Sequence, residues 1–497
     1  MTFAQRNISL QDAPTALPGH VIIGGGVCGC LLAHQLATRS NQPVWIIEAG
    51  GEQAENQSDR DRPARWLHLL GSSDDYAFST LPNDALSGRQ ITWPRGRGLG
   101  GSGRINAMIW LPPHSSDLQT LADAGLDRSS LNNALETSQT LIPTEAPRFV
   151  SESSQHFLDS VQHDSNLGTF AAYQRINRFG RRWTTARLLD DLDQTSPEST
   201  ARVRVIQANV NELSIRENQV EAIQLQSGRL VRDLVISADT QVVSCAGALG
   251  TPELMMRSGI QHPAIGANLH DHLIMPIIYR HSGSGFLPGR PNMNQLAAWQ
   301  HGGTGPLASN IAECGGFDPS MRFQLHVTPT DYLRYPARAG DPAMTFAVSL
   351  TRPQSRGRLT LSEADTNTPA QRLQIDTGYL SDRNDVGELI EAVRWGRQLA
   401  ESLQQSGWLL KESTPGVKRQ SDSQLEAAIA RFTQTLYHPG GSCSLGTVVD
   451  ANFRACGLEN LRIVDASLLP EPTFGNPTGV LAMLTCYAAQ AIAGKQK

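Results

Sequence analysis

The first fifty residues alternate between short apolar runs and a stretch of helical periodicity. Val21 to Ile23 forms one apolar run, and Val44 to Ile47 forms a second. Between these runs, leucines recur at helical spacing, at Leu31, Leu32 and Leu36. Apolar β-branched runs of this length favour buried strands, whereas the intervening spacing favours a helix. The pattern therefore predicts a strand, a helix and a second strand in that order.

The turn between the first predicted strand and the helix is rich in glycine. Gly24, Gly26 and Gly29 have GxGxxG spacing, and Glu48 ends the second predicted strand nineteen residues after Gly29. Such glycines let the backbone approach a pyrophosphate at a helix N-terminus, and an acid at this distance accepts hydrogen bonds from ribose hydroxyls. The spacing predicts a dinucleotide site, and an acid rather than a basic residue favours FAD or NAD over NADP.

A second GxGxxG match, at Gly98, Gly100 and Gly103, does not fit a nicotinamide site. Pro94 precedes it, residues 104–111 lack helical periodicity, and no acid follows at the matching distance. We therefore expect this segment to be a glycine loop of another kind.

The rest of the chain shows further strand patterns and one apolar C-terminal helix. The expected strands are Val203–Ile206, Val220–Leu225, Leu230–Ile236, Val242–Ser244, Phe323–Val327 and Met344–Leu350. The helix is expected over Gly479–Ala493, with Thr478 as its N-cap. Its polar interruptions and its length predict a buried helix rather than a membrane span.

Composition narrows the class of protein. The 497 residues carry a formal net charge of −5, which gives no reason to expect a nucleic-acid partner. The seven cysteines are odd in number and never spaced as C-x-x-C, so the sequence indicates neither a disulfide framework nor a metal site. The first eighteen residues do not resemble a signal peptide. We expect a cytoplasmic protein without a membrane span.

Several longer motifs resemble the glucose-methanol-choline (GMC) oxidoreductase family. The segment Gly96–Gln119 matches the first family signature at Gly96, Arg97, Leu99, Gly100, Gly101, Ser102, Gly103, Ile105, Asn106, Trp110 and Pro113. The second signature is matched over Gly247–Ile260 and departs only at Gln261, where the family usually has glycine. IGANLHDH, SRGRLTL and the C-terminal segment that begins YHPGGSCSLG extend the resemblance over residues 19–494.

The resemblance implies an α/β (α+β) fold. A Rossmann-like FAD-binding domain would carry an inserted substrate-binding domain built on an antiparallel sheet. We expect the FAD-binding domain in residues 19–150, 200–280 and 430–497, the substrate-binding domain in 151–199 and 281–429, and an N-terminal tail in 1–18.

The resemblance also implies oxidation of an alcohol by hydride transfer to FAD. Such a step requires removal of the hydroxyl proton, and an imidazole with an ordinary pKa of about 6.5 is suited to accept it. His438, in YHPGGSCSLG, matches the catalytic histidine of the family. Asn476, in FGNPTGV, stands where the family has a second histidine or an asparagine, and its amide would hydrogen-bond the substrate oxygen. An asparagine before proline is also a common turn residue.

Other family positions imply contacts with FAD. Val210 would meet the adenine through its main chain, Asp465 would contact the FAD chain, and the last helix would begin beside the flavin. The full set of expected FAD contacts is Gly24, Gly26, Gly29, Glu48, Gly100, Gly101, Ser102, Asn106, Val210, Asp465, Pro477 and Thr478. Ile105 occupies the position of the histidine that links covalently to flavin in choline-oxidising relatives, which implies non-covalent FAD.

Other functions within the same family remain open from the sequence. The family includes hydroxynitrile lyases and a fatty-acid photodecarboxylase, and a flavin-binding protein without turnover is a third alternative. The presence of both His438 and Asn476 favours redox chemistry. The expected partners are a small-molecule alcohol and an electron acceptor, either O2 or another compound. The sequence indicates neither the identity of the alcohol nor the oligomeric state.

Overall fold

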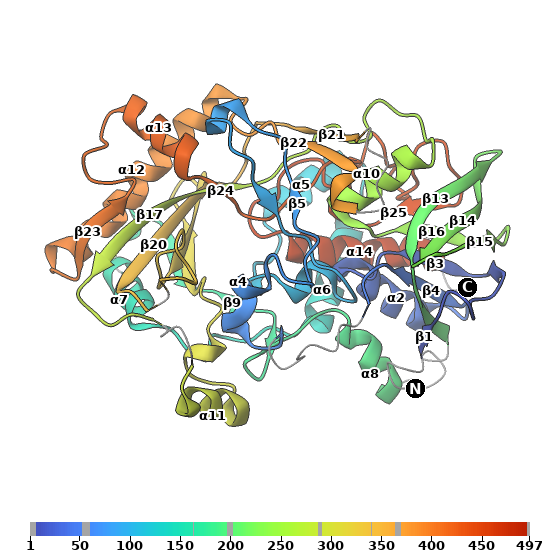
Figure 1. Ribbon diagram of the computed structural model, residues 1–497, viewed down its shortest axis with the longest axis horizontal. Helices are drawn as coiled ribbons and strands as arrows, with labels where there is room; N and C mark the ends of the chain where they lie inside the picture. The colour runs from blue at the N-terminus through green and yellow to red at the C-terminus, as the bar shows by residue number, and fades with distance from the viewer. Residues whose placement is uncertain are drawn as a thin grey trace.

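Two large sheets of different kinds organise the chain, one at each end of the molecule (Figure 1). The parallel sheet with β3 and β4 lies on the right of this view, and the antiparallel sheet with β17 and β20 lies on the left. The computed structural model describes residues 6–51, 60–162, 164–195, 202–286, 291–338, 340–362 and 369–494. The mixed α/β class expected from the sequence is confirmed.

The six-stranded sheet contains the strand–helix–strand unit predicted near the N-terminus. In spatial order its strands are β1 (Asn7–Ile8), β12 (Val203–Gln207), β4 (Val44–Glu48), β3 (His20–Ile23), β16 (Gln241–Ser244) and β25 (Leu461–Ile463). All of their pairings are parallel. Every residue of β3 is buried, as expected for a strand that is covered on both faces of a parallel sheet.

A smaller sheet and four two-stranded pairs account for further described strands. The four-stranded sheet has the order β13 (Asn209–Arg216), β14 (Gln219–Ser227), β15 (Leu230–Ile236) and β2 (Ala16–Leu17). The two-stranded pairs are β5 (Phe78–Ser79) with β6 (Thr92–Trp93), β7 (Ile109–Trp110) with β9 (Gln174–Arg175), β10 (Asn177–Arg178) with β11 (Arg181–Arg182), and β21 (Arg358–Leu361) with β22 (Leu373–Asp376).

The seven-stranded sheet is antiparallel throughout. Its order is β23 (Leu409–Thr414), β17 (Leu273–His281), β20 (Ala343–Leu350), β19 (Phe323–Thr328), β18 (Cys314–Phe317) and β8 (Thr169–Ala172), and β24 (Gln434–Thr435) also pairs with β17. Residues 273–280 and 434–435 therefore belong to this sheet, although the expected boundaries placed them in the FAD-binding domain. The reason is the nine-residue strand β17, which is buried along almost its whole length and crosses the expected boundary at residue 280.

Helices cover the sheets and connect them. The described α-helices are α2 (Val27–Arg39), α4 (Trp66–Leu69), α5 (Ser115–Asp123), α6 (Arg128–Leu141), α7 (Glu152–Val161), α8 (Arg187–Thr195), α10 (Gly247–Arg257), α11 (Met293–Gly302), α12 (Arg383–Gln405), α13 (Asp422–Phe432) and α14 (Thr478–Ala493). The C-terminal helix α14 packs against α2 and α6. None of the helices within the described residues is long and apolar enough to cross a membrane.

The expected N-terminal tail differs from the structure. Within the described part of residues 1–18, β1 forms the edge of the parallel sheet and β2 joins the four-stranded sheet. Leu10, Ala13 and Leu17 are buried, so apolar contacts hold this segment in place. Two-residue strands are too short to produce a periodic pattern, and the sequence therefore gave no signal for them.

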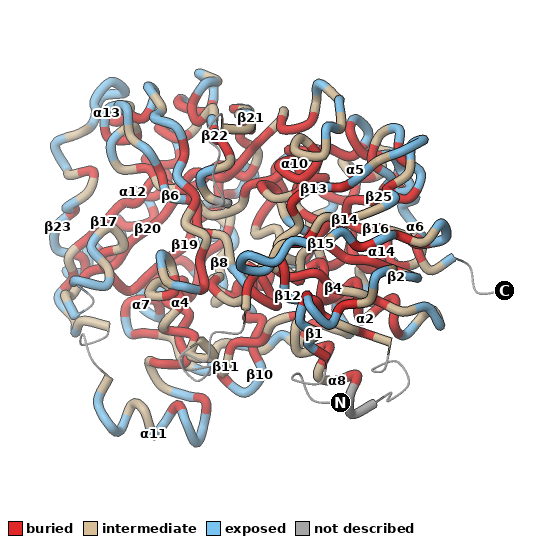
Figure 2. Tube along the Cα trace, turned by 45° about the vertical axis from the view of Figure 1, so that its right-hand side comes forward, coloured by how far each residue is buried: buried red, intermediate tan, exposed pale blue. Residues whose placement is uncertain are grey.

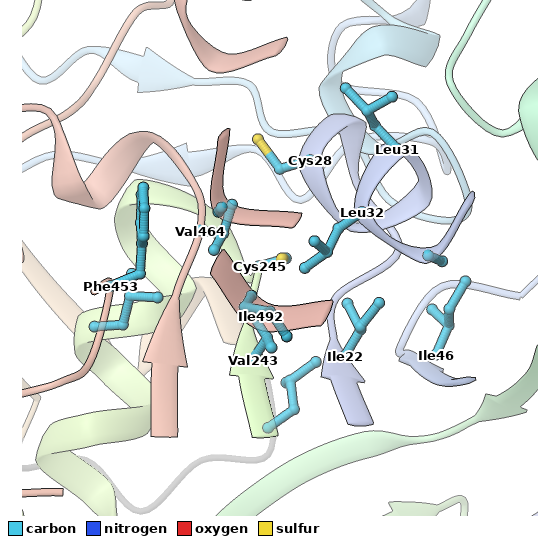
Figure 3. Packing of buried hydrophobic residues seen from close by; sticks show 14 of the residues in the cluster. Ile22, Cys28, Leu31, Leu32, Ile46, Val243, Cys245, Phe453, Val464 and Ile492 are labelled. Atoms are coloured by element: carbon cyan, nitrogen blue, oxygen red, sulfur yellow. The ribbon is translucent and has the colours of Figure 1, made fainter. Parts of the chain in front are cut away.

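The main core lies between the parallel sheet and its covering helices. Ile22 of β3, Ile46 of β4 and Val243 of β16 pack in one cluster with Leu32 of α2 (Figure 3). Figure 2 shows that burial is continuous through the middle strands of both large sheets, whereas α11 lies at the surface. The parallel sheet thus provides a rigid base for the loops at its carboxyl edge.

Gly29 is required for close packing of α2 on the first glycine turn. A Cβ atom at this position would lie 1.9 Å from the carbonyl oxygen of Gly24. We predict that Gly29→Ala lowers the free energy of unfolding by about 1–3 kcal/mol or more, since the backbone must shift to relieve the overlap. Thermal or denaturant unfolding of the two purified proteins measures the difference.

Gly387 of α12 is the matched control, because it is exposed and a Cβ atom there would meet nothing within 4 Å. Gly387→Ala should leave stability unchanged or raise it by up to about 1 kcal/mol, given the helix propensity of alanine. Equal stability of Gly29→Ala and the wild type would contradict the packing role.

Candidate active site

One cavity of about 370 Å³ is lined by residues from both large sheets. Its lining includes Ile23 and Glu48 at the ends of β3 and β4, and His326 and Ala347 of β19 and β20. His438 and Asn476 line this cavity, and so do all of the expected FAD contacts except Gly29 and Gly100. The structure therefore brings residues that are hundreds of positions apart in the chain to one place.

Three helices begin at this cavity. Gly26 precedes α2, Ala246 precedes α10 and Pro477 precedes α14, and all three residues line the cavity. None of these three residue types has a side chain that can accept a hydrogen bond from the first helical amides. These N-termini therefore direct backbone N–H groups and partial positive charge toward the cavity, which together favour an anionic ligand, although the first amide of α10, that of Gly247, is already bonded to Asp465. The expectation that Thr478 is the N-cap of α14 is wrong, because the helix already begins at Thr478.

The carboxylate of Glu48 binds three backbone amides beside the cavity. The N–H of Gly25 donates to Oε2 at 2.8 Å, and the N–H groups of Gly50 and Gly98 donate to Oε1 at 2.8 and 3.1 Å. A carboxylate offers about four acceptor positions, so it can accept further hydrogen bonds from a ligand. Glu48 thus connects the first glycine turn to the second glycine loop.

The second glycine loop packs directly on the first. The N–H of Gly100 donates to the carbonyl oxygen of Gly25 at 2.7 Å, and a Cβ atom on Gly101 would lie 2.7 Å from the Cα atom of Gly26. Gly100 and Gly101 also have left-handed φ values of 93° and 49°. A short 3-10 helix, Gly101–Arg104, follows in place of an α-helix. This loop is therefore not a second dinucleotide turn, in agreement with the sequence analysis.

The fully buried Asp465 supports the start of α10. Its carboxylate accepts hydrogen bonds from the backbone amides of Gly247 and Ser467, both at 2.8 Å, and from the hydroxyl of Thr251 at 2.5 Å. Burial raises the pKa of this carboxyl group, whereas these hydrogen bonds lower it. Gly247 lies at the cavity, so Asp465 fixes the backbone that a ligand would meet.

Taken together, the donor groups and the glycine contacts fit a dinucleotide. The two glycine loops can lie close together because no side chain separates them. The helix N-termini supply N–H groups for a pyrophosphate. Glu48 supplies an acceptor for hydroxyl groups. Val210, at the start of β13, lines the same cavity and carries an apolar side chain.

His438 and Asn476 face each other beside the first turn of α14. Nε2 of His438 lies 3.3 Å from Nδ2 of Asn476. The amide donates and an imidazole nitrogen accepts, so the two groups can bind the same small hydroxyl group from two sides. Burial lowers the pKa of His438 well below its ordinary value, and the nearby His272, His326 and Arg95 lower it further. His438 is therefore neutral near pH 7.

Asp271, which the sequence analysis did not single out, holds the backbone of His438. Its Oδ1 accepts the N–H of His438 at 2.7 Å, and its Oδ2 accepts the hydroxyls of Thr435, at 2.6 Å, and Tyr379. Tyr437, which directly precedes His438, has a left-handed φ of 69°, a strained value for a non-glycine residue. The guanidinium of Arg95 donates to the carbonyl oxygen of Tyr437 at 2.6 Å and helps to hold this conformation.

His272 contacts the other ring nitrogen of His438. The two Nδ1 atoms are 3.3 Å apart, and Nε2 of His272 lies 3.3 Å from the carbonyl oxygen of Thr351. A carbonyl oxygen only accepts, so the contact with Thr351 is a hydrogen bond when Nε2 of His272 carries the proton, and Nδ1 of His272 is then an acceptor. In that tautomer Nδ1 of His438 is the donor, which leaves Nε2 of His438 as an acceptor toward Asn476. Asp271 and His272 both belong to the IGANLHDH motif, which was the available sequence signal.

Comparisons with known proteins agree with this arrangement. GMC oxidoreductase models match residues 19–274 and 353–485. Alcohol dehydrogenase (acceptor) from Pseudomonas putida is 27% identical, over 96% of this chain and 96% of its own length. Oxygen-dependent choline dehydrogenase from Escherichia coli O45:K1 (strain S88 / ExPEC) is 29% identical, over 96% of this chain and 94% of its own length.

The structural similarity is equally extensive. Pyridoxine 4-oxidase from Mesorbium loti superposes with a TM-score of 0.81 at 26% sequence identity, covering 95% of this chain and 98% of that protein. Two family models that together span most of the chain, with both large sheets present, determine the assignment. This chain belongs to the GMC oxidoreductase family.

Proposed function

We propose that this protein oxidises the CH–OH group of a small-molecule alcohol to a carbonyl by hydride transfer to FAD, with His438 as the general base. The observation that carries the proposal is the pair of His438 and Asn476, whose side chains lie 3.3 Å apart at the cavity. Relatives named as an alcohol dehydrogenase and a choline dehydrogenase support this class of reaction.

The residues that would hold FAD are those that line the dinucleotide end of the cavity. Gly24, Gly26 and Gly101 would approach the pyrophosphate closely, and Glu48 would accept hydrogen bonds from the ribose. The remaining contacts would come from Ser102, Asn106, Val210, Asp465, Pro477 and Thr478. When bound, FAD supplies a two-electron acceptor for hydride from the substrate carbon.

His438 provides the proton acceptor. The alcohol hydroxyl would donate to Nε2, the nitrogen that the hydrogen bond at Nδ1 leaves without a proton. Because burial keeps the pKa of His438 low, the ring is in its basic form near neutral pH. Transfer of the hydroxyl proton to Nε2 allows the carbon–oxygen double bond to form as hydride leaves the carbon.

Asn476 and the N-terminus of α14 orient the substrate and stabilise charge. The Nδ2 group would donate to the alcohol oxygen while the hydroxyl proton points to His438. Pro477 and Thr478 start α14 directly after Asn476, so the positive end of the helix lies at the same place. Negative charge that develops there is stabilised by the first amides of the helix.

The first prediction from this proposed function concerns the base. His438→Ala should retain FAD, because most dinucleotide contacts lie elsewhere, but anaerobic flavin reduction by an alcohol should slow by roughly 10²–10⁴-fold. In the wild type the reduction rate should fall only when the pH drops below the ordinary histidine value of about 6.5, since the pKa of His438 is lowered. This acid limb should disappear in the variant. Stopped-flow absorbance over a range of pH values measures both effects.

Asn476→Ala serves as the comparison for this experiment. Reduction should slow because the substrate is poorly positioned, but the acid limb should remain because the base is present. Wild-type reduction by His438→Ala, with its acid limb unchanged, would place the base elsewhere.

The second prediction concerns His272 as a positioning residue. His272→Leu removes the acceptor for the Nδ1 proton of His438, so that proton can move to Nε2 and block the base. We expect flavin reduction to slow by roughly 10-fold or more, within the range of about 10⁴ known for loss of tautomer control. His272→Asn keeps an acceptor near the same position and should restore part of the rate at unchanged FAD content. Equal rates for the two variants would argue against control of the tautomer.

The third prediction is that FAD is held without a covalent bond. Ile105 lines the cavity next to Asn106, and its aliphatic side chain cannot form a bond to the flavin. After acid precipitation, the flavin absorbance should therefore appear in the supernatant and leave a colourless pellet. A yellow pellet would disprove this.

A further inference from the structure

Strand β19 presents a row of polar side chains to the end of the cavity that contains His438 and Asn476. Phe323, Leu325 and Val327 belong to the core of the antiparallel sheet. The alternating residues Gln324, His326 and Thr328 must face the opposite side, because successive side chains of a strand point to opposite faces. His326 and Thr328 line the cavity, and Nε2 of Gln324 lies 3.5 Å from Oδ1 of Asn476.

His326 and Thr328 are buried without hydrogen-bond partners among the described residues. Each is 3% exposed, and neither ring nitrogen of His326 nor the hydroxyl of Thr328 has a partner. Leaving buried polar atoms unpaired costs stability, so such atoms in a cavity wall indicate a ligand that pairs with them. Burial lowers the pKa of His326 to about 3. The ring is therefore neutral and offers one donor and one acceptor.

The other side chains named at this end of the cavity are apolar or already have hydrogen-bond partners. Trp66, Met108 and Leu436 contribute apolar surface, and the hydroxyls of Tyr332 and Tyr437 bond each other at 2.9 Å. An alcohol with an apolar body would fit this wall, while its polar substituent would reach β19.

The carboxylates in the described lining are also paired. Glu48 and Asp465 bind backbone amides, and Glu253 lies 3.4 and 3.5 Å from Arg372 and Arg257. A cationic substrate would therefore find no free counter-charge among the described residues of this wall.

We propose that His326 and Thr328 form a subsite for a second polar group of the substrate, so that the enzyme prefers uncharged alcohols that carry a ring nitrogen, a hydroxyl or a carbonyl group besides the reacting hydroxyl. This inference rests on the proposed function, because it assigns the substrate class of the same site. The two residues lie two positions apart on one strand face, so one planar or extended substituent can contact both.

Anaerobic stopped-flow reduction of the FAD-loaded protein tests this with matched pairs of alcohols. Benzyl alcohol is compared with pyridin-3-ylmethanol, and hexan-1-ol with hexane-1,6-diol, with choline as the cationic probe. The wild type should favour the polar member of at least one pair by roughly 10-fold or more in the ratio of limiting rate to dissociation constant. Choline should be poorer than that polar alcohol.

Two variants remove the polar atoms while keeping the shape of the wall. His326→Phe and Thr328→Val should each reduce the preference, mainly by raising the dissociation constant of the polar alcohol, at unchanged FAD content. Thr330→Val is the matched control, because Thr330 is buried and its hydroxyl is unpaired, but it does not line the cavity. This control should keep the wild-type preference.

The outcomes separate the two proposals. Equal rates within both pairs, a preference that survives in both variants, or choline as the best substrate would overturn the subsite while leaving alcohol oxidation intact. Absence of flavin reduction with every alcohol would overturn the proposed function, and the subsite with it.

Discussion

The binding of three backbone amides by the carboxylate of Glu48 is the interaction on which the site depends. Gly25, Gly50 and Gly98 come from three loops, and each donates its N–H to this one side chain. Glycine loops pack closely only when their backbone amides have acceptors, because a buried amide without a hydrogen-bond partner lowers the stability of the fold. A strand-end acid can thus hold backbone loops together and still accept a hydrogen bond from a ligand hydroxyl.

The end of the cavity that contains His438 and Asn476 depends on burial in a similar way. Desolvation is the largest cause of the lowered pKa of His438, of His272 and of His326. If water entered, the pKa values of these three imidazoles would rise toward the ordinary histidine value, because water would again solvate the charged form. The antiparallel sheet supplies His326, and Asp271 and His272 directly precede β17 of that sheet. The sheet therefore does more than form one wall of the cavity, because it also supplies part of the buried surroundings that lower the pKa of His438.

Much of the fold could be predicted from local patterns, and part of the site could not. β3, α2 and β4 follow from apolar runs and one glycine turn, and Glu48 from its spacing. β1 and β2 were missed because two residues carry no periodicity. His272 and His438 are 166 positions apart in the chain, and only the packing of β17 brings their Nδ1 atoms together. His326 has an ordinary strand pattern around it, and its unpaired nitrogens are visible only in the folded protein.

The proposed function requires that FAD bound in this cavity accept hydride from the carbon of an alcohol. Anaerobic mixing of the FAD-loaded protein with a primary alcohol, and with the same alcohol deuterated at the reacting carbon, tests it most directly. We expect the oxidised flavin absorbance to bleach with both, and more slowly with the deuterated alcohol, because the C–H bond breaks in this step. Retention of the oxidised absorbance with every primary and secondary alcohol tried would contradict the account.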